Sequence, residues 1–160
     1  MPTSTSSFSE SEQLTTEPME TQKITLFYLS DRDSLLHPEE REIVAGSSVV
    51  HQARQTIEEL LKGSLNGSIS PFPPETKLRE LFLTREGIAY VDFSRELEER
   101  HLAGSEAEIA TIFSIVNSLT YNFESIKKVF ILIDGDERET LGGHIDLSKP
   151  FLAQYRLIAN

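Results

Sequence analysis

A histidine close to several aspartates near the C-terminus is the most reactive-looking arrangement in this sequence. His144 follows two glycines and precedes Asp146 by two residues, and Asp134 and Asp136 stand shortly before it. Such a histidine can act as a general base or as a metal ligand. In the alternative, structural role His144 hydrogen-bonds the backbone of a closing segment, which the glycines allow to approach tightly. We expect the structural role, because no nucleophile or orienting group accompanies the histidine.

The remaining histidines offer no metal site. No two histidines have the i, i+4 spacing that presents a ligand pair on a helix. We therefore expect solvated side chains at His37, His51 and His101.

Other motifs also point away from catalysis. Asp31-Arg32-Asp33 begins like a calcium loop, but Leu36 stands at the sixth position, where the loop needs glycine. We expect an ordinary turn there, since aspartate commonly ends strands. The chain has no cysteine, and it lacks the glycine-rich phosphate-binding motifs and the Gly-x-Ser-x-Gly nucleophile motif. We predict no catalytic residue, no metal and no cofactor.

Composition limits the partners. The chain has 160 residues, enough for one domain, and a formal charge of −11 at pH 7. Nucleic acid and anionic bilayers repel such a protein at long range, and Lys127-Lys128 is too small a basic cluster to reverse this. No apolar run reaches the roughly 18 residues of a membrane span, and the first residues lack a signal peptide. The protein is either cytosolic, or its anchor has been removed and Met1 is an expression start.

The N-terminal stretch, residues 1–22, is rich in Ser, Thr and Glu, with isolated apolar residues at Phe8, Leu14 and Met19. It cannot bury enough apolar surface to offset the entropy of ordering it. We predict a disordered tail or stalk over residues 1–22 and a folded domain over residues 23–160.

The first half of the domain shows two strands and a helix. Residues 24–29 are rich in β-formers, and a weaker strand over residues 35–44, interrupted by Pro38, suits a sheet edge. Ser47 or Ser48 caps a helix that stops at Gly63. Its apolar stripe is Val50, Ala53, Ile57, Leu60 and Leu61. The proline-rich residues 64–74 predict an irregular loop.

The second half adds two strands, a helix and a last strand. Residues 78–84 and 88–93 flank a short turn that contains Gly87, and a helical turn follows over residues 95–102. Ser105 and Glu108 predict a capping box at the start of the next helix. Its buried stripe is Ile109, Ile112, Phe113, Val116 and Leu119, widened by Ala110 and Ile115. Residues 129–133 are apolar on both faces and predict a central strand.

These elements predict the fold class. The order β(β)αββαβ does not strictly alternate, so we expect a single α+β domain with two main helices packed on one face of a mixed or antiparallel sheet. The predicted core joins both helix stripes to Val91, Phe93, Val129, Ile131 and Ile133.

Several separated segments together resemble the GerMN domain family of sporulation and spore-germination proteins, in the family's order and spacing over residues 23–151. The segment 71–78 resembles the family's proline-rich loop, with Glu75 where glycine is common. The other matching segments are residues 57–63, 89–94, 106–120, 133–135 and 139–146.

The resemblance implies an extracytoplasmic interaction module on a lipoprotein or behind a membrane anchor, with no catalytic residue to carry over. It also implies similarity to ring-building modules, envelope proteins as partners, higher-order assembly at the membrane, and no nucleic acid. The competing hypothesis is an envelope hydrolase or carbohydrate-binding domain that uses Asp92, Asp134 and His144. It requires these three side chains to converge in one concave pocket.

Overall fold

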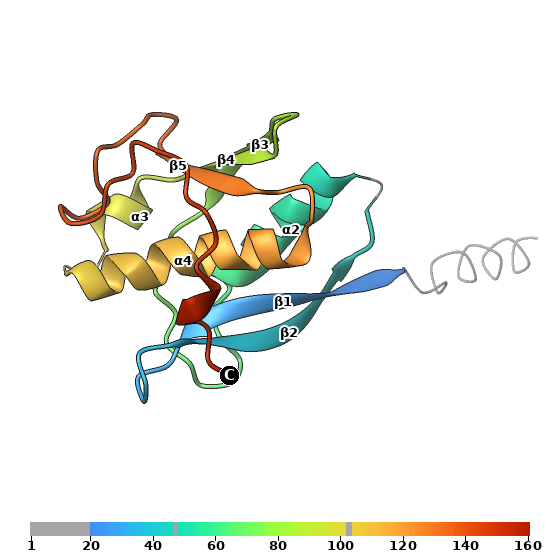
Figure 1. Cartoon of the computed structure of the whole chain (residues 1–160), viewed down its shortest axis with the longest axis horizontal. Coiled ribbons are helices and arrows are strands. Elements are labelled where there is room, and N and C mark those ends of the chain that lie inside the picture. The colour runs from blue at the N-terminus through green and yellow to red at the C-terminus, as the bar shows by residue number, and fades with distance from the viewer. Residues whose placement is uncertain (1–19, 47, 102–103) are drawn as a thin grey trace, which may run out of the picture.

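The structure is a computed structural model that describes residues 20–46, 48–101 and 104–160. In these residues two layers of strands enclose two long helices, α2 and α4 (Figure 1). In chain order the elements are β1 (Thr21–Leu29), β2 (Leu36–Val44), α2 (Val49–Leu61), β3 (Leu78–Leu83), β4 (Ile88–Phe93), α3 (Glu96–Glu99), α4 (Ser105–Asn122), β5 (Lys128–Ile133) and the 3-10 turn η1 (Tyr155–Leu157).

The strands form two separate sheets. Strands β1 and β2 make an antiparallel hairpin, and β4 pairs antiparallel with β3 and parallel with β5. The predicted α+β class and element order are confirmed, and the helices lie between the hairpin and the three-stranded sheet.

Strand β5 is not central, contrary to the prediction. It ends the β3-β4-β5 sheet, and the C-terminal segment covers its outer edge. Val129 N–H donates to Phe151 O (3.0 Å), and Phe151 N–H donates to Val129 O (2.8 Å). Burial on both faces indicated a central strand, but here Phe130 is buried on the outer face of a strand that has only β4 as a full neighbour.

The core follows the predicted apolar faces. The predicted inward residues of β4 and β5 (Val91, Phe93, Val129, Ile131 and Ile133) are all buried. Ser48 caps α2 as expected, because its side chain accepts the His51 N–H at 3.1 Å. The apolar stripes of α2 and α4 fill much of the interior between the two layers, and the hairpin adds Ile24, Leu26, Tyr28 and Ile43.

The predicted capping box of α4 is wrong. Gly104 occupies the N-cap position, and no side-chain hydrogen bond caps the start of this helix. Ser105 lies inside the helix, and Glu108 is fully buried. The local pattern failed because Glu108 lies on the same face as Ile112, one turn further on, so packing turns it inward.

Strand β1 begins at Thr21, inside the stretch predicted as a tail. Thr21 and Gln22 pair with Val44 and Ile43, which extends the hairpin to its full length. The prediction for residues 1–19 lies outside the described residues.

Candidate functional site

Asp92 and Asp134 lie together at one end of the three-stranded sheet. Asp92, on β4, is buried and accepts the Gly135 N–H at 2.8 Å. Arg79 of β3 joins the two carboxylates, with Nη1 at 2.9 Å from Asp134 Oδ1 and Nε at 3.8 Å from Asp92 Oδ2. The guanidinium thus offsets charge that a buried carboxylate could not carry alone.

The Asp134-Gly135 turn is fixed by its backbone as well. Asp134 adopts a left-handed conformation with φ of 53°, which asparagine and aspartate tolerate better than most residues. Its N–H donates to Phe93 O at 2.7 Å, and Arg95 Nη2 lies 3.7 Å from its carboxylate. These contacts tie the ends of β4 and β5 together, which is a structural role.

His144 belongs to a different cluster. Its Nδ1 lies 2.5 Å from Oε2 of Glu108, at the start of α4. Glu108 also accepts backbone N–H groups from Gly142 (3.0 Å), His144 (3.2 Å) and Ile145 (3.2 Å). One buried carboxylate therefore holds the whole closing loop. Burial alone would raise the pKa of Glu108, but these donors outweigh it and place that pKa below its ordinary value.

The three candidate residues do not form one site. Asp92 and Asp134 share Arg79, whereas His144 is bound by Glu108, and no contact among the described residues joins His144 to either aspartate. The competing hydrolase hypothesis required Asp134 near His144, but Asp134 faces Arg79 and Arg95. Within the described ranges no three His, Asp or Glu side chains cluster as metal ligands would.

The role of Glu108 in this region was not predicted, because the sequence indicated a helix-capping role for it. A signal was present: it precedes Ile112 by four residues and so shares the buried stripe of α4. A glutamate on an apolar stripe needs donors from elsewhere in the chain. Gly142, His144 and Ile145 supply them, and the missing side chain of Gly142 lets the loop approach closely, since a Cβ there would meet Glu108 Oε2 at 3.1 Å.

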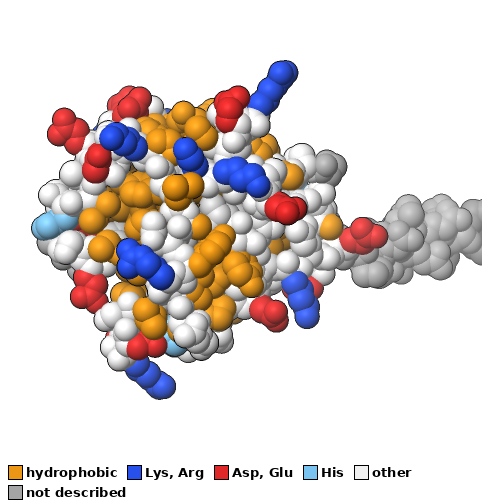
Figure 2. All heavy atoms as spheres, in the orientation of Figure 1, with side chains coloured by type: hydrophobic (Ala, Val, Ile, Leu, Met, Phe, Trp, Pro, Cys, Tyr) orange, Lys and Arg blue, Asp and Glu red, His pale blue; other side chains and the backbone are white. Residues whose placement is uncertain are grey.

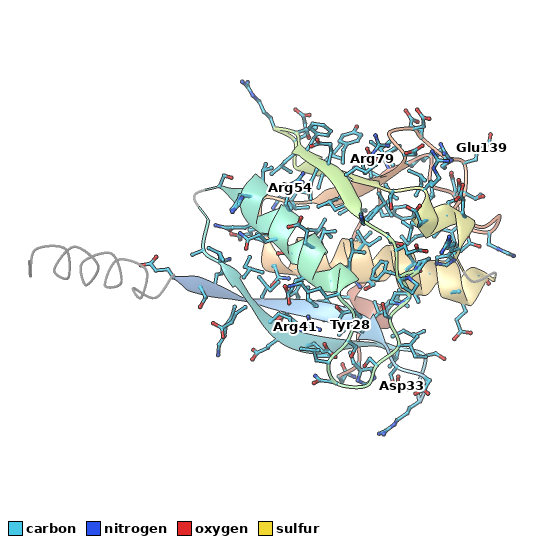
Figure 3. The ribbon with its side chains drawn as sticks, turned by 180° about the vertical axis from the view of Figure 1, so that it is seen from behind. Tyr28, Asp33, Arg41, Arg54, Arg79 and Glu139 are labelled. Carbon is cyan, nitrogen blue, oxygen red and sulfur yellow. The ribbon has the colours of Figure 1, made fainter. Side chains whose placement is uncertain are left out.

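A second buried polar cluster lies between the hairpin and the end of α2 (Figure 3). Arg41 is 8% exposed, and its guanidinium reaches Glu39 (3.0 Å), Glu59 (3.1 Å) and the Gly63 carbonyl (2.5 Å). Its Cζ lies 5.9 Å from the ring centre of Tyr28. Strand β2 lies at a sheet edge, as predicted, but its Glu39 and Arg41 are buried and pair with each other.

Tyr28 completes this cluster. Its hydroxyl donates to the Leu60 carbonyl at 2.7 Å. Burial raises the pKa of Tyr28 to about 12, although the neighbouring Arg41 opposes the change. Burial also acts to raise the pKa of Glu39, but donors from Ser64 and its neighbours outweigh it and lower that pKa. Every charge of this cluster has a partner, so none is left buried without compensation, which gives the cluster a structural role.

The remaining histidines and the Asp31–Asp33 turn have local roles. Asp33 accepts the Leu35 N–H at 3.0 Å and lies 2.9 Å from His37 Nε2, which is the expected turn. His101 contacts the Thr111 hydroxyl at 2.5 Å, so it is not simply solvated. The side chain of His51 is exposed on α2.

The surface has apolar features but no membrane-spanning helix among the described residues. A hollow of about 260 Å³ lies between the end of the hairpin and α4, lined chiefly by Leu29, Leu36, Ile109, Ala110 and Leu157. On the face shown in Figure 2, apolar side chains are interspersed with basic ones, and most of the acidic side chains lie toward the rim.

Solved structures share this fold. A Clostridium perfringens protein described provisionally as a lipoprotein is 28% identical, with a TM-score of 0.60 over 82% of this chain and 87% of that one. The first GerMN domain of the Bacillus subtilis sporulation protein GerM is 22% identical, with a TM-score of 0.62 over 83% of this chain and 98% of that one. The tandem GerMN domains of GerM are 22% identical to this chain, with a TM-score of 0.62. The match spans 86% of this chain but 48% of the tandem.

No curated protein matches the chain in sequence. The family model described as Germane, sporulation and spore germination, matches residues 25–139, which is most of the folded domain. The fold, the order of the sequence motifs and the family model all indicate the same family. The chain belongs to the Germane family, whose GerMN domains occur in sporulation and spore-germination proteins.

Proposed function

We propose that this domain is a non-catalytic, extracytoplasmic interaction module of an envelope protein. The observation that carries the proposal is the division of the polar candidates into two unconnected structural clusters. Asp92 and Asp134 fix a turn through Arg79, and His144 is tied to the buried Glu108. Hydrolysis would need an activated nucleophile or a pair of carboxylates free to act on a substrate in a pocket. The Asp92 and Asp134 carboxylates are instead both held by Arg79.

Family and charge support the same function. The similarity to a protein described as a lipoprotein favours a place outside the cytoplasm, at the membrane surface. The formal charge of −11 disfavours nucleic acid and direct adsorption to an anionic bilayer. The domain then acts by presenting a rigid surface to another envelope protein, and higher-order assembly occurs at the membrane, where local concentration is high.

An assay for hydrolysis that compares the full chain with two substituted chains distinguishes this proposal from the hydrolase hypothesis. The full chain, Asp134→Asn and His144→Ala are each incubated with purified cell-wall polymer, and soluble products are followed by mass spectrometry. We expect the same product profile in all three samples as in polymer alone. Product that accumulates with time, and that either substitution abolishes while the far-ultraviolet circular dichroism is unchanged, would establish the hydrolase.

A further inference from the structure

The C-terminal residues cross the outer side of α4. Residues 147–160, here called the C-terminal strap, pass in front of α4 in Figure 1 and so lie on the face that Figure 2 shows. Toward one end Phe151 is paired with Val129 of β5, and near the other the Ala159 N–H donates to Leu36 O of β2 at 2.8 Å. The strap therefore joins the two sheets.

The buried side chain of Asn117, on α4, fixes the middle of the strap. It accepts the Gln154 N–H at 2.9 Å and donates to the Gln154 carbonyl at 3.1 Å. The Tyr155 hydroxyl donates to Thr120 Oγ1, also on α4, at 3.1 Å. Because α4 binds both backbone groups of Gln154, the neighbouring side chains are held in place before any partner arrives. Such a surface loses less entropy on binding.

Three large apolar side chains are exposed on this face. Leu152 and Tyr155 of the strap are 58% and 48% exposed, and Tyr121 of α4 is 57% exposed. The rings of Tyr121 and Tyr155 meet edge to face with centroids 6.2 Å apart, and the buried Phe27 packs against Tyr121 at 5.2 Å. Tyrosine offers a large contact area together with a polar group, so it is enriched at protein interfaces.

The segments that build this face are basic. They are residues 109–123 of α4, strand β5 and the strap, and none of the chain's 26 Asp and Glu residues falls in them. Their three basic residues, Lys128, Lys149 and Arg156, are all exposed. In a chain with a formal charge of −11 this is a local reversal of sign.

Two of these cations lie next to the exposed apolar side chains. Val129 and Phe151 form an antiparallel bridge, which places Lys128 of β5 opposite Leu152 of the strap. Arg156 directly follows one of the exposed tyrosines. Apolar surface and positive charge are therefore interleaved on one face.

Lys128 and Arg156 are also the cations that a partner's carboxylates can reach. Arg156 Nε donates to Gln154 Oε1 at 3.1 Å, which is a neutral partner. Neither cation forms an ion pair with a carboxylate of the residues that the structure describes. Lys149 is less available. Hydrogen bonds within its own turn chiefly lower the pKa of Asp146, and Lys149 adds to that change, so its charge is partly offset within the chain.

Neither a second copy of the chain nor an anionic bilayer suits this face. A two-fold symmetric dimer buries the same face of both copies, so the cations of one copy would meet those of the other. The formal charge of −11 repels both a second copy and an anionic bilayer at long range. A short segment with only a few carboxylates is repelled far less, and its charges match the local cations.

We propose that one face of the domain binds a short segment of another envelope protein, in which apolar side chains stand beside Asp or Glu. This strap face consists of Tyr121, Lys128, Leu152, Tyr155 and Arg156. The proposal rests on the interaction function given above and names its surface. Apolar side chains of the segment pack on the leucine and the tyrosines, and its carboxylates pair with the two cations. A few central contacts supply most of the affinity in such interfaces, and the surrounding charges set orientation.

Selection from a random dodecapeptide display library, with the full chain as bait, tests the proposal. We expect the selected peptides to combine Asp or Glu with large apolar residues, and to bind less tightly at high salt because the charges are screened. Lys128→Glu and Arg156→Glu each reverse one exposed charge, and Leu152→Ser removes exposed apolar surface. Each should weaken binding of the selected peptides by about tenfold.

Matched controls make the same changes elsewhere on the surface. Lys77→Glu reverses an exposed charge beside α2, and Leu65→Ser alters a leucine that is 78% exposed in the loop before β3. Both should leave affinity unchanged. Circular dichroism and urea unfolding check that each variant is folded. If Leu152→Ser fails to fold, the two charge reversals decide alone.

Three results would overturn the proposal. The first is the absence of any enriched acidic and apolar sequence, and the second is equal affinity of the selected peptides for the native chain and the strap-face variants. The third is binding of the native chain to phosphatidylglycerol vesicles, or dimerisation at micromolar concentration, that the same variants abolish. Peptides that bind another surface also remove the strap face but leave the interaction function standing, whereas the turnover assay tests that function separately.

Discussion

Glu108 and His144 join the start of α4 to the C-terminal segment, with 2.5 Å between Glu108 Oε2 and His144 Nδ1. Glu108 is fully buried, and it accepts three backbone N–H groups from the same loop. The sequence predicted a helix cap for Glu108 and a separate backbone contact for His144, whereas the two side chains bind each other. It makes residues 142–145 a clasp that returns the chain to the body of the domain.

Loss of the His144 ring should weaken the clasp modestly. His144→Ala removes one hydrogen bond from a half-exposed side chain, while the backbone donors to Glu108 remain. We expect the free energy of unfolding in urea to fall by about 1 kcal/mol. His51→Ala, on an exposed helix position, is the control and should be nearly silent. If both substitutions changed the free energy of unfolding equally, the proposed structural role of His144 would be wrong.

Acid should open the same clasp. Glutamate in the unfolded chain has a pKa of about 4.3. Because the folded pKa of Glu108 is lowered, its stabilising contribution is complete above the unfolded pKa and is lost as the pH falls through the folded pKa. Glu108→Gln should therefore be less stable than the native chain at neutral pH. The gap between their free energies of unfolding should narrow below about pH 4.3. A gap independent of pH would contradict this assignment.

The edge of β1 that faces α4 gives a third prediction, because side chains of α4 bond the backbone of Phe27 there. Ser114→Ala deprives the Phe27 carbonyl of its donor in a buried setting. An unsatisfied buried acceptor costs about 1–3 kcal/mol, so the free energy of unfolding should drop by that amount. Ser148→Ala is the control, because its hydroxyl contacts only the exposed side of Asp146. A loss for Ser114→Ala no larger than that control would show that α4 does not complete the strand edge.

Deletion of core volume tests the packing of the two layers. Ile112 of α4 and Ile131 of β5 are 0% and 2% exposed. Replacement of either by alanine should cost about 2–5 kcal/mol in the free energy of unfolding, the usual range for a large core side chain. Calorimetry would show the same loss as a lower Tm. A change near zero would mean that the inward faces are misassigned.

Local patterns predicted the elements of this fold well. The stripe that ends at Leu60 and Leu61 marked α2, and the alternation of Ala89, Val91 and Phe93 marked the inward face of β4. These features depend on residues a few positions apart, which a single sequence displays directly.

The contacts that were not predicted from the sequence join residues far apart in the chain. Glu108 and His144 are 36 residues apart, and Arg79 and Asp134 are 55 apart, so no local rule connects them. Strand β5 was predicted to be central because it is apolar on both faces. The C-terminal segment that covers its edge at Phe151 has no strand pattern of its own, so this pairing could not be predicted. Arg41 is buried because it pairs with Glu59 of α2 and with the Gly63 carbonyl just beyond that helix, 18 and 22 residues further along the chain, which no strand pattern displays.

Sedimentation velocity of the fluorescently labelled full chain, in buffer and in detergent-solubilised envelope extract, tests the claim of association most directly. In low-salt buffer at micromolar concentration we expect a monomer of 18.1 kDa, because the formal charge of −11 opposes self-association where it is least screened. In the extract we expect a larger species that the unlabelled chain competes away. A stable dimer in low-salt buffer, with no further change in the extract, would contradict the account.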